Sequence, residues 1–191
     1  MTMRDDDPLT SVTEHLGSAL AALGATQASD PELADTARRF ARLLHHRFRP
    51  DAPRHRLEPL PLESPPTGPV VLRDLPFHAL CVHHVVPFFG HVHLYFVPGR
   101  SLVGFGAVGR LVDSLCARPQ LQERLTDQLA QAIMDDLAPR HVVVASEARQ
   151  MCMELTGACK TGTTISVAGR GVGSNAERDW EIARQLLRNT R

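Results

Sequence analysis

The sequence predicts an α+β protein in which N-terminal helices are followed by a mixed body of strands and helices. Three observations indicate this class. Apolar residues recur at helical spacing in several segments, other segments are rich in β-branched and aromatic residues, and a proline-rich stretch separates the first helices from the rest. We expect the strands to be antiparallel. With 43% hydrophobic and 22% charged residues, the 191-residue chain has the composition of an ordinary globular protein with a core.

Two helices are expected in residues 1–48. The first covers Leu9–Leu23, where apolar residues recur every three or four positions until Gly24 ends the pattern. The second begins at Asp30, a capping residue followed by Pro31, whose missing N–H costs nothing in a first helical turn. These two helices make up a predicted N-terminal helical region.

Residues 49–69 hold seven prolines and show no apolar periodicity, which excludes a helix or a central strand. We predict a proline-rich linker, or an arm wrapped over the surface. The remaining residues, 70–191, are expected to form the main domain. Strands are predicted where β-branched and aromatic residues concentrate, at Val70–Leu75, His91–Val97, His141–Ala148 and Thr161–Ala168.

Two further helical segments are predicted in the main domain. Leu111–Leu137 carries leucine and isoleucine four apart along one stripe, which indicates one long core-facing helix after a break at Pro119. Asn175–Leu187 is predicted to be a final helix capped by Ser174.

Charge and cysteine content bear on partners and compartment. The 21 basic residues balance the 21 acidic ones, so the bulk charge gives no reason to expect nucleic acid or an anionic lipid surface as a partner. No segment suggests a membrane span or a secretory signal, and four cysteines are too few for a disulfide framework. We therefore expect a cytoplasmic protein without nucleic-acid or membrane partners.

The run Cys81-Val82-His83-His84 and a distant Cys152 offer three ligands for one Zn²⁺ ion. Two thiolates and one imidazole suit zinc, and a fourth position left to water distinguishes a catalytic zinc site from a closed structural one. The C-x-x-H pair can share a metal only where the backbone bends. The alternative is a buried cysteine with two histidines bonded within the fold. His83 is a candidate for binding substrate or transferring a proton, with a core histidine as its alternative.

Four stretches resemble the GTP cyclohydrolase I family, in the same order along the chain from Asp30 to Gly173. Val70–Gly90 (VVLRDLPFHALCVHHVVPFFG) is similar to the segment around the family's Cys-Glu-His-His motif, and Arg118–Thr126 (RPQLQERLT) to its substrate-anchoring helix. EARQMCM is similar to the segment with the third zinc ligand, and TARRFARL to an N-terminal threonine-proline-basic stretch. The resemblance makes residues 70–191 the expected catalytic domain.

This resemblance implies a tunnelling fold (T-fold), in which an antiparallel sheet has helices packed on one face and subunits join edge to edge into a multi-subunit barrel. It implies a homo-oligomer, by resemblance a decamer, with active sites between subunits. It also implies that Cys81, His84 and Cys152 bind Zn²⁺ and that zinc-bound water attacks a ring carbon of a small heterocyclic substrate, in pterin and tetrahydrofolate biosynthesis. Gln122 and Glu123 match the residues that bind the guanine edge.

Two departures from the family pattern concern the chemistry. Val82 stands where the family motif has glutamate, and Gln150 stands where the family has a second catalytic histidine, two residues before the last zinc ligand. An amide cannot exchange a proton near pH 7, and loss of a general acid or base typically costs on the order of 10²–10⁴-fold in rate. We therefore expect Gln150 at a catalytic position and a weak or absent reaction with GTP.

Other departures concern the phosphates. Gly106 and Ala107 replace a Ser-Lys pair and Thr156 replaces an arginine, so that Arg110 alone remains of three matched cations. Because a triphosphate needs several charge-assisted partners, we expect a substrate without one. Three other cations could compensate from new positions: Arg100, Arg149 and Lys160.

Three hypotheses follow from these residues. The first is a zinc-dependent hydrolase of a purine- or pterin-like ring or amide without triphosphate. The second is an authentic GTP cyclohydrolase I that makes formate and dihydroneopterin triphosphate. The third is a non-catalytic, zinc-containing relative that binds a small ligand or modifies a related enzyme.

Overall fold

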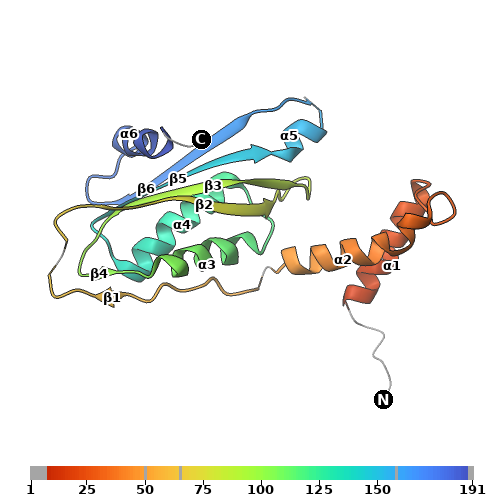
Figure 1. Ribbon diagram of the computed structural model, residues 1–191, viewed down its shortest axis with the longest axis horizontal. Coiled ribbons are helices and arrows are strands. Elements are labelled where there is room, and N and C mark those ends of the chain that lie inside the picture. Colours follow the sequence, from red (N-terminus) through yellow and green to blue (C-terminus); the bar gives the residue numbers. More distant parts are fainter. Residues whose placement is uncertain (1–7, 50, 65, 158, 189–191) are drawn as a thin grey trace, which may run out of the picture. The chain divides into compact units, whose positions relative to one another are not determined.

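The chain divides into two compact units, one up to Arg49 and one after it. The computed structural model describes residues 8–49, 51–64, 66–157 and 159–188. Between residues 8 and 49, the first unit contains α1 (Pro8–Ala22), the short 3-10 helix η1 (Pro31–Asp35) and α2 (Thr36–Arg47). Helices α1 and α2 pack against each other (Figure 1). In the described part of this unit, Ala41 alone is buried.

The ends of these helices follow the predicted signals with one difference. Gly24, just after α1, has a φ of 75°, a left-handed conformation that glycine adopts without steric cost. The Asp30 side chain accepts a hydrogen bond from the Glu32 amide and is followed by Pro31, as the sequence predicts. The first turns are 3-10, however, and the α-helix begins only at Thr36.

The core of the second unit is a four-stranded antiparallel sheet with the order β2-β3-β5-β6. Its strands are β2 (Val70–Leu80), β3 (Pro87–Val97), β5 (His141–Gln150) and β6 (Thr163–Gly171). A separate two-stranded sheet pairs β1 (Leu60–Pro61) with β4 (Ser101–Leu102). Strands β2 and β6 are the edges of the larger sheet within this chain. All four predicted strands are present, and β2 and β3 extend towards the Cys81–His84 turn.

Helices α3 (Phe105–Cys116) and α4 (Gln122–Leu137) lie on one face of the sheet (Figure 1). Pro119 lies in the connection between them, so the predicted break is present and the long core-facing helix expected after it is α4. The apolar residues before the break belong to α3. Both helices bury their apolar stripes against the sheet, because leucine, valine and isoleucine recur there at helical spacing. This arrangement confirms the α+β class with an antiparallel sheet, and α3 and α4 pack on one face as expected.

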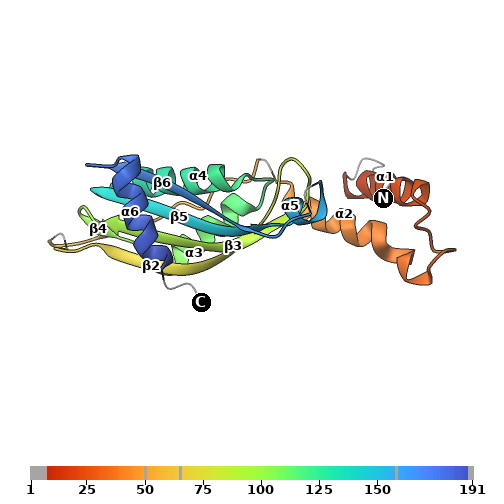
Figure 2. The same cartoon turned by 90° about the horizontal axis from the view of Figure 1, so that it is seen from above.

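Alternation along β5 explains how the two faces of the sheet are filled. Val142 and Val144 belong to the main core that includes α3 and α4, whereas Val143 and Ala145 pack against Ala183. Ala183 belongs to α6 (Ala176–Leu187), which covers part of the opposite face (Figure 2). The last helix therefore adds a smaller second layer of packing.

The cap of α6 differs from the prediction. Asn175, not Ser174, is the capping residue, and its side chain accepts a hydrogen bond from the Arg178 amide. The Ser174 hydroxyl donates instead to Asp179, which also bonds to His141 on β5. Ser174 thus fixes the acidic residue that joins α6 to the sheet.

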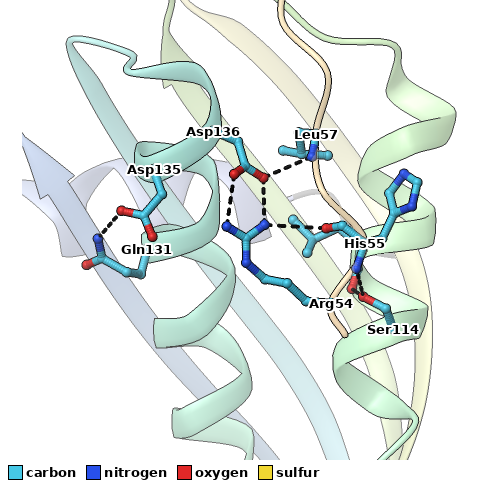
Figure 3. Close-up of polar contacts among 8 residues, drawn as sticks. Arg54, His55, Leu57, Ser114, Gln131, Asp135 and Asp136 are labelled. Carbon is cyan, nitrogen blue, oxygen red and sulfur yellow. Dashed lines mark hydrogen bonds and ion pairs between the residues drawn. The ribbon is translucent and has the colours of Figure 1, made fainter. Parts of the chain in front are cut away.

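The proline-rich stretch packs closely on the helices. Residues 51–61, called the strap below, run along α3 and α4 (Figure 3). The Arg54 guanidinium donates to both carboxylate oxygens of Asp136, at 2.6 and 2.9 Å. The Leu57 amide donates to the same carboxylate, and the Leu57 side chain is buried in the core. The His55 amide donates to the Ser114 hydroxyl.

Across the described ranges of the chain, none of the helices combines the length and the apolar character needed to cross a membrane.

Candidate metal centre and active site

A tight turn after β2 brings Cys81 and His84 together. The Cys81 amide donates to the Val86 carbonyl, and the Val85 amide donates back to the Cys81 carbonyl. Val85 has a φ of 56°, a conformation that a β-branched residue rarely adopts, so the surrounding bonds must hold this turn. The Cys81 Sγ and His84 Nδ1 atoms lie 3.9 Å apart. The bend that the C-x-x-H spacing required is therefore present.

The third predicted ligand comes from a distant part of the chain. Cys152 lies in the short helix α5 (Met151–Leu155), directly after β5. Phe88 of β3 pairs with Gln150, the last residue of β5, and Pro87 pairs with Leu80, the last residue of β2. This register places the end of β5 beside the turn after β2 and so brings Cys152 to Cys81.

Cys81, His84 and Cys152 form a group whose ligand atoms all lie within 4.8 Å of one another. Ligands about 2.0–2.3 Å from a tetrahedral zinc ion are separated by roughly 3.5–4 Å, so the donor set and spacing fit zinc. Cys81 is buried, Cys152 is half-buried and His84 is exposed. The group therefore offers three ligands and one open side.

The two thiols influence each other. Burial raises the pKa of the Cys152 thiol, and the neighbouring Cys81 raises this pKa further by charge repulsion and a hydrogen bond. Two thiolates held this close need a compensating positive charge, and a divalent metal would supply it. The fit to a metal thus rests on charge as well as on distance.

Gln150 lies next to the metal-ligand group in a network of side-chain hydrogen bonds. Its Nε2 atom donates to Gln122 Oε1 at 2.8 Å and to Thr164 Oγ1 at 3.2 Å. Gln122 is buried, and its own Nε2 donates to Ser146 and to the Thr164 carbonyl. A substrate contact by the Gln122 side chain would have to replace one of these bonds.

Comparison with known proteins identifies the relationship of the chain. The sequence profile described as GTP cyclohydrolase I matches residues 12–188. The chain belongs to the GTP cyclohydrolase I family. It is 39% identical over 150 residues to GTP cyclohydrolase 1 of Clostridioides difficile (strain 630), a match that covers 75% of this chain and 79% of that protein.

Other family members give similar values. GTP cyclohydrolase 1 of Campylobacter jejuni (serotype O:23/36) is 38% identical over 130 residues, 68% of each chain. GTP cyclohydrolase 1 of Brevibacillus brevis is 48% identical over 105 residues, 54% of this chain and 56% of that one.

Among solved structures, the crystal structure of the archaeosine synthase QueF-Like in the apo form has a TM-score of 0.43 and 14% identity, covering 56% of this chain and 96% of that chain. The enzyme family supports a GTP cyclohydrolase I-type function.

Two residues predicted to belong to the site, His83 and Glu123, are exposed, the first beside the metal-ligand group and the second on α4. His83 follows the Cys81-Val82 pair, and its ring centroid lies 6.2 Å from that of His84. Glu123 is exposed in the first turn of α4, next to Gln122. Val82 is also exposed, at 40% of its accessible surface. These side chains are accessible from outside the chain.

Arg110 lies in a different place from the metal-ligand group within this chain. It lines a cavity of about 230 Å³ on α3 and the strap, and none of the three metal-ligand residues lines this cavity. His55, Arg56 and Glu58 lie around the same cavity, and Arg110 Nε is 3.4 Å from His55 Nε2. The sequence did not single out His55 or Arg56, because the proline-rich stretch carries no motif that points to a site.

The positions that lack the family's cations have different surroundings in the structure. Ala107 lines the Arg110 cavity without contributing a charge, while Arg56 brings a second cation there. Arg149, one of the suggested compensating cations, is instead paired with Glu154 by two 2.5 Å bonds, which lower the pKa of Glu154. Thr156 donates its hydroxyl hydrogen to the Cys152 carbonyl at the end of α5.

Proposed function

We propose that the chain is a zinc-dependent hydrolase that acts on a purine- or pterin-like heterocycle without a triphosphate. The observation that carries this proposal is the combination of a complete three-ligand group with an amide, Gln150, at the position of the family's second catalytic histidine. The ligands would retain the metal chemistry, while the amide cannot supply a proton near pH 7. This chain would therefore keep the metal-dependent step of the family's reaction and differ in the step that needs a proton from the residue at position 150.

Each site residue has a role in this proposal. Cys81, His84 and Cys152 would bind the zinc, which when bound supplies an ionised water near neutral pH. His83, exposed beside the ligands, is suited to take or give the proton that the ring or leaving group exchanges. Glu123 can accept hydrogen bonds from a ring N–H and an exocyclic amine.

The cavity around Arg110 supports a substrate with little negative charge. Arg56 and Arg110 provide two cations there, and the carboxylate of Glu58 opposes them. Since a triphosphate needs several charge-assisted partners, this cavity suits one small anionic group better than three phosphates. Arg149 is occupied by Glu154 and would have to break an ion pair to contribute.

The separation of Arg110 from the metal-ligand group favours a homo-oligomeric enzyme. Both places would contribute to one site only if the cavity of one chain faced the metal-ligand group of another. We therefore propose that the active site lies between subunits, as the family resemblance implies.

The second candidate function is the GTP cyclohydrolase I reaction itself, which makes formate and dihydroneopterin triphosphate from GTP. Two observations favour it: relatives 38–48% identical are GTP cyclohydrolase 1 proteins, and Arg56 lies beside Arg110 where the matched lysine is lost. In that case a water molecule or His83 would replace the missing histidine at position 150.

Both candidates can be tested with one preparation of known zinc content. Formate release and pterin fluorescence would be followed with GTP, GMP and guanosine, using the Cys152→Ser variant as the zinc-deficient control. Turnover of GMP or guanosine but not GTP supports the first candidate, whereas efficient turnover of GTP supports the second. Full zinc occupancy without turnover of any purine or pterin analogue would support the non-catalytic alternative and contradict both.

A further inference from the structure

The hydrogen-bond network around Gln150 determines which end of its amide is bonded within the fold and which end is left to accept another hydrogen bond. Gln122 Nε2 lies 3.1 Å from the Ser146 carbonyl oxygen and 3.0 Å from the Thr164 carbonyl oxygen. Backbone carbonyls can only accept, so this end of the Gln122 amide must be the nitrogen. Its oxygen therefore points the other way, towards Gln150.

The neighbouring hydroxyls agree with this orientation. The Thr126 hydroxyl donates to the backbone carbonyl of Gln122, which leaves the Ser146 hydroxyl to donate to Thr126 at 2.7 Å. Ser146 Oγ can then accept from Gln122 Nε2, as its 3.1 Å distance indicates. Every hydrogen in this buried group has an acceptor, so reversing the Gln122 amide would set its oxygen against two carbonyls.

The orientation of Gln122 fixes that of Gln150. Gln122 Oε1 can only accept, so the Gln150 atom beside it must be Nε2. Both hydrogens of this nitrogen are used, one by Gln122 Oε1 and one by Thr164 Oγ1, while the Thr164 hydroxyl donates to Gln122. Gln150 Oε1 has no donor among the residues that the structure describes.

We propose that Gln150 acts as a fixed hydrogen-bond acceptor that selects ligands presenting an N–H beside the metal-ligand group, and that Gln122 and Thr164 are positioning residues. A ring nitrogen with a lone pair, such as N7 of guanosine, would face this oxygen with a second acceptor and be disfavoured. A ring that carries hydrogen on the equivalent nitrogen, such as that of 8-oxoguanosine, would donate to it. The choice of purine-like ligands rests on the proposed function.

Binding to the zinc-loaded, full-length protein tests this inference without turnover. Dissociation constants would be measured by calorimetry for guanosine, 8-oxoguanosine and 7-deazaguanosine, whose position 7 carries a lone pair, an N–H and a C–H, respectively. We expect 8-oxoguanosine to bind about tenfold more tightly than guanosine, with 7-deazaguanosine between them. The Gln150→Met variant should reduce the ratio to about one.

The positioning role has its own variants. Gln122→Met should also remove most of the selectivity ratio, but should change nothing further in the Gln150→Met background, because Gln122 acts only through Gln150. Thr164→Val should lower the ratio and Thr164→Ser should keep it, since serine retains the hydroxyl. Gln131→Met, an exposed change on the same helix as Gln122, is the matched control and should leave the ratio unchanged.

The outcomes separate this inference from the proposed function. If the nucleosides bind but guanosine binds as well as 8-oxoguanosine, or if Gln150→Met leaves the ratio unchanged, the acceptor role is overturned while a purine-like ligand stands. If Gln122→Met lowers the ratio equally in the presence and absence of Gln150, its positioning role is overturned. If none of the three nucleosides binds to protein with full zinc occupancy, the purine-like substrate of the proposed function is overturned, and the selectivity proposal with it.

Discussion

At the scale of single residues, the metal-ligand group depends on three side chains from two places in the sequence. Replacing Cys152 by serine should reduce the bound zinc from about one ion per chain to a small fraction, because a hydroxyl is a far weaker zinc ligand than a thiolate. The matched control is Cys159→Ser, an exposed cysteine outside the group, which should keep full occupancy. Elemental analysis after dialysis measures both, and equal zinc content in the two variants would contradict the assignment.

His93 makes a prediction about pH. This side chain is fully buried, and burial holds the pKa of its imidazole below the usual range; Asp74 opposes this shift, and Arg73 and His91 add to it. Below about pH 6.5 the unfolded chain therefore binds a proton at His93 that the folded chain does not bind as readily. The free energy of unfolding is highest above this pH and decreases as the pH falls below it. The slope for one proton is at most about 1.4 kcal/mol per pH unit.

The His93→Asn variant tests this dependence, since its side-chain oxygen can accept the Asp74 amide bond that His93 Nδ1 accepts. We expect the free energy of unfolding, measured with urea, to fall less between pH 7 and pH 5 in this variant than in the unaltered protein. His91→Asn, an exposed change on the same strand, removes only the smallest of the causes that shift the His93 pKa and should keep most of the original slope. Identical slopes in all three proteins would rule out the contribution of His93.

The sequence predicted which residues come together where residue type and spacing alone indicate a metal-ligand group. Cys81, His84 and Cys152 were found as one group because thiols and imidazoles are distinctive metal ligands. Thr164 and Ser146 were not found, because hydroxyl residues on strands carry no signal until the register is known. The roles of the predicted site residues remain proposals that the experiments above address.

At the scale of elements, the strap is held to α4 by one bidentate ion pair. Replacing Arg54 by methionine should cost about 2 kcal/mol of unfolding free energy, because the nearly buried Asp136 carboxylate would keep only the Leu57 amide as a donor. The Arg54 guanidinium holds the pKa of Asp136 below its usual range, so this stabilisation is present above about pH 4 and lost as pH falls.

A surface ion pair provides the comparison for the strap. Arg184→Met removes an exposed partner of Glu181 and should cost less than about 0.5 kcal/mol. Chemical denaturation at pH 7 gives both values. A cost for Arg54→Met as small as that of the control would mean that the strap is not held by this pair.

Two glycines of the second unit should respond in opposite directions to alanine. A Cβ atom at Gly90 would lie 1.9 Å from the Glu147 carbonyl oxygen on β5, so Gly90→Ala must move one strand and should cost at least about 3 kcal/mol. Gly109 lies inside α3 with nothing within 4 Å of its Cβ position, so Gly109→Ala should stabilise the chain by about 1 kcal/mol. The melting temperatures of both variants test these expectations. An unchanged melting temperature for Gly90→Ala would contradict the close approach of β3 and β5 at this position.

The elements were predictable to different degrees. Strands and helices with a strong apolar period were located, since burial on one face imposes that period. The break between α3 and α4 was predicted at Pro119, because proline interrupts a helix even where one apolar stripe continues across it. The packing of the strap was not predictable, because proline-rich segments have no period and Arg54 finds Asp136 only in the folded chain.

At the scale of the whole molecule, the sheet ends in two long edge strands. Both β2 and β6 carry exposed apolar side chains, with Val71 exposed at 47% and Ile165 at 44%. Unprotected edges of this length favour pairing with another chain. We expect light scattering to give a mass of at least twice the 21.0 kDa of one chain. A mass of one chain at micromolar concentration would contradict this proposal.

An edge variant tests how the chains would associate. Ile165→Lys places a charge on β6 and should shift the mass towards that of the single chain, since charged edge residues oppose strand pairing. Val172→Lys changes an apolar residue that is 78% exposed outside the strand, and should leave the mass unchanged.

The strap also constrains the order in which the chain can fold. Arg54 and Asp136 are separated by 82 residues, so the N-terminal partner leaves the ribosome long before its carboxylate. At roughly 5–20 residues per second, the interval is on the order of ten seconds. During that time the strap lacks its ion-pair partner on α4, and Leu57, which is buried in the folded chain, is available to chaperones or to other nascent chains.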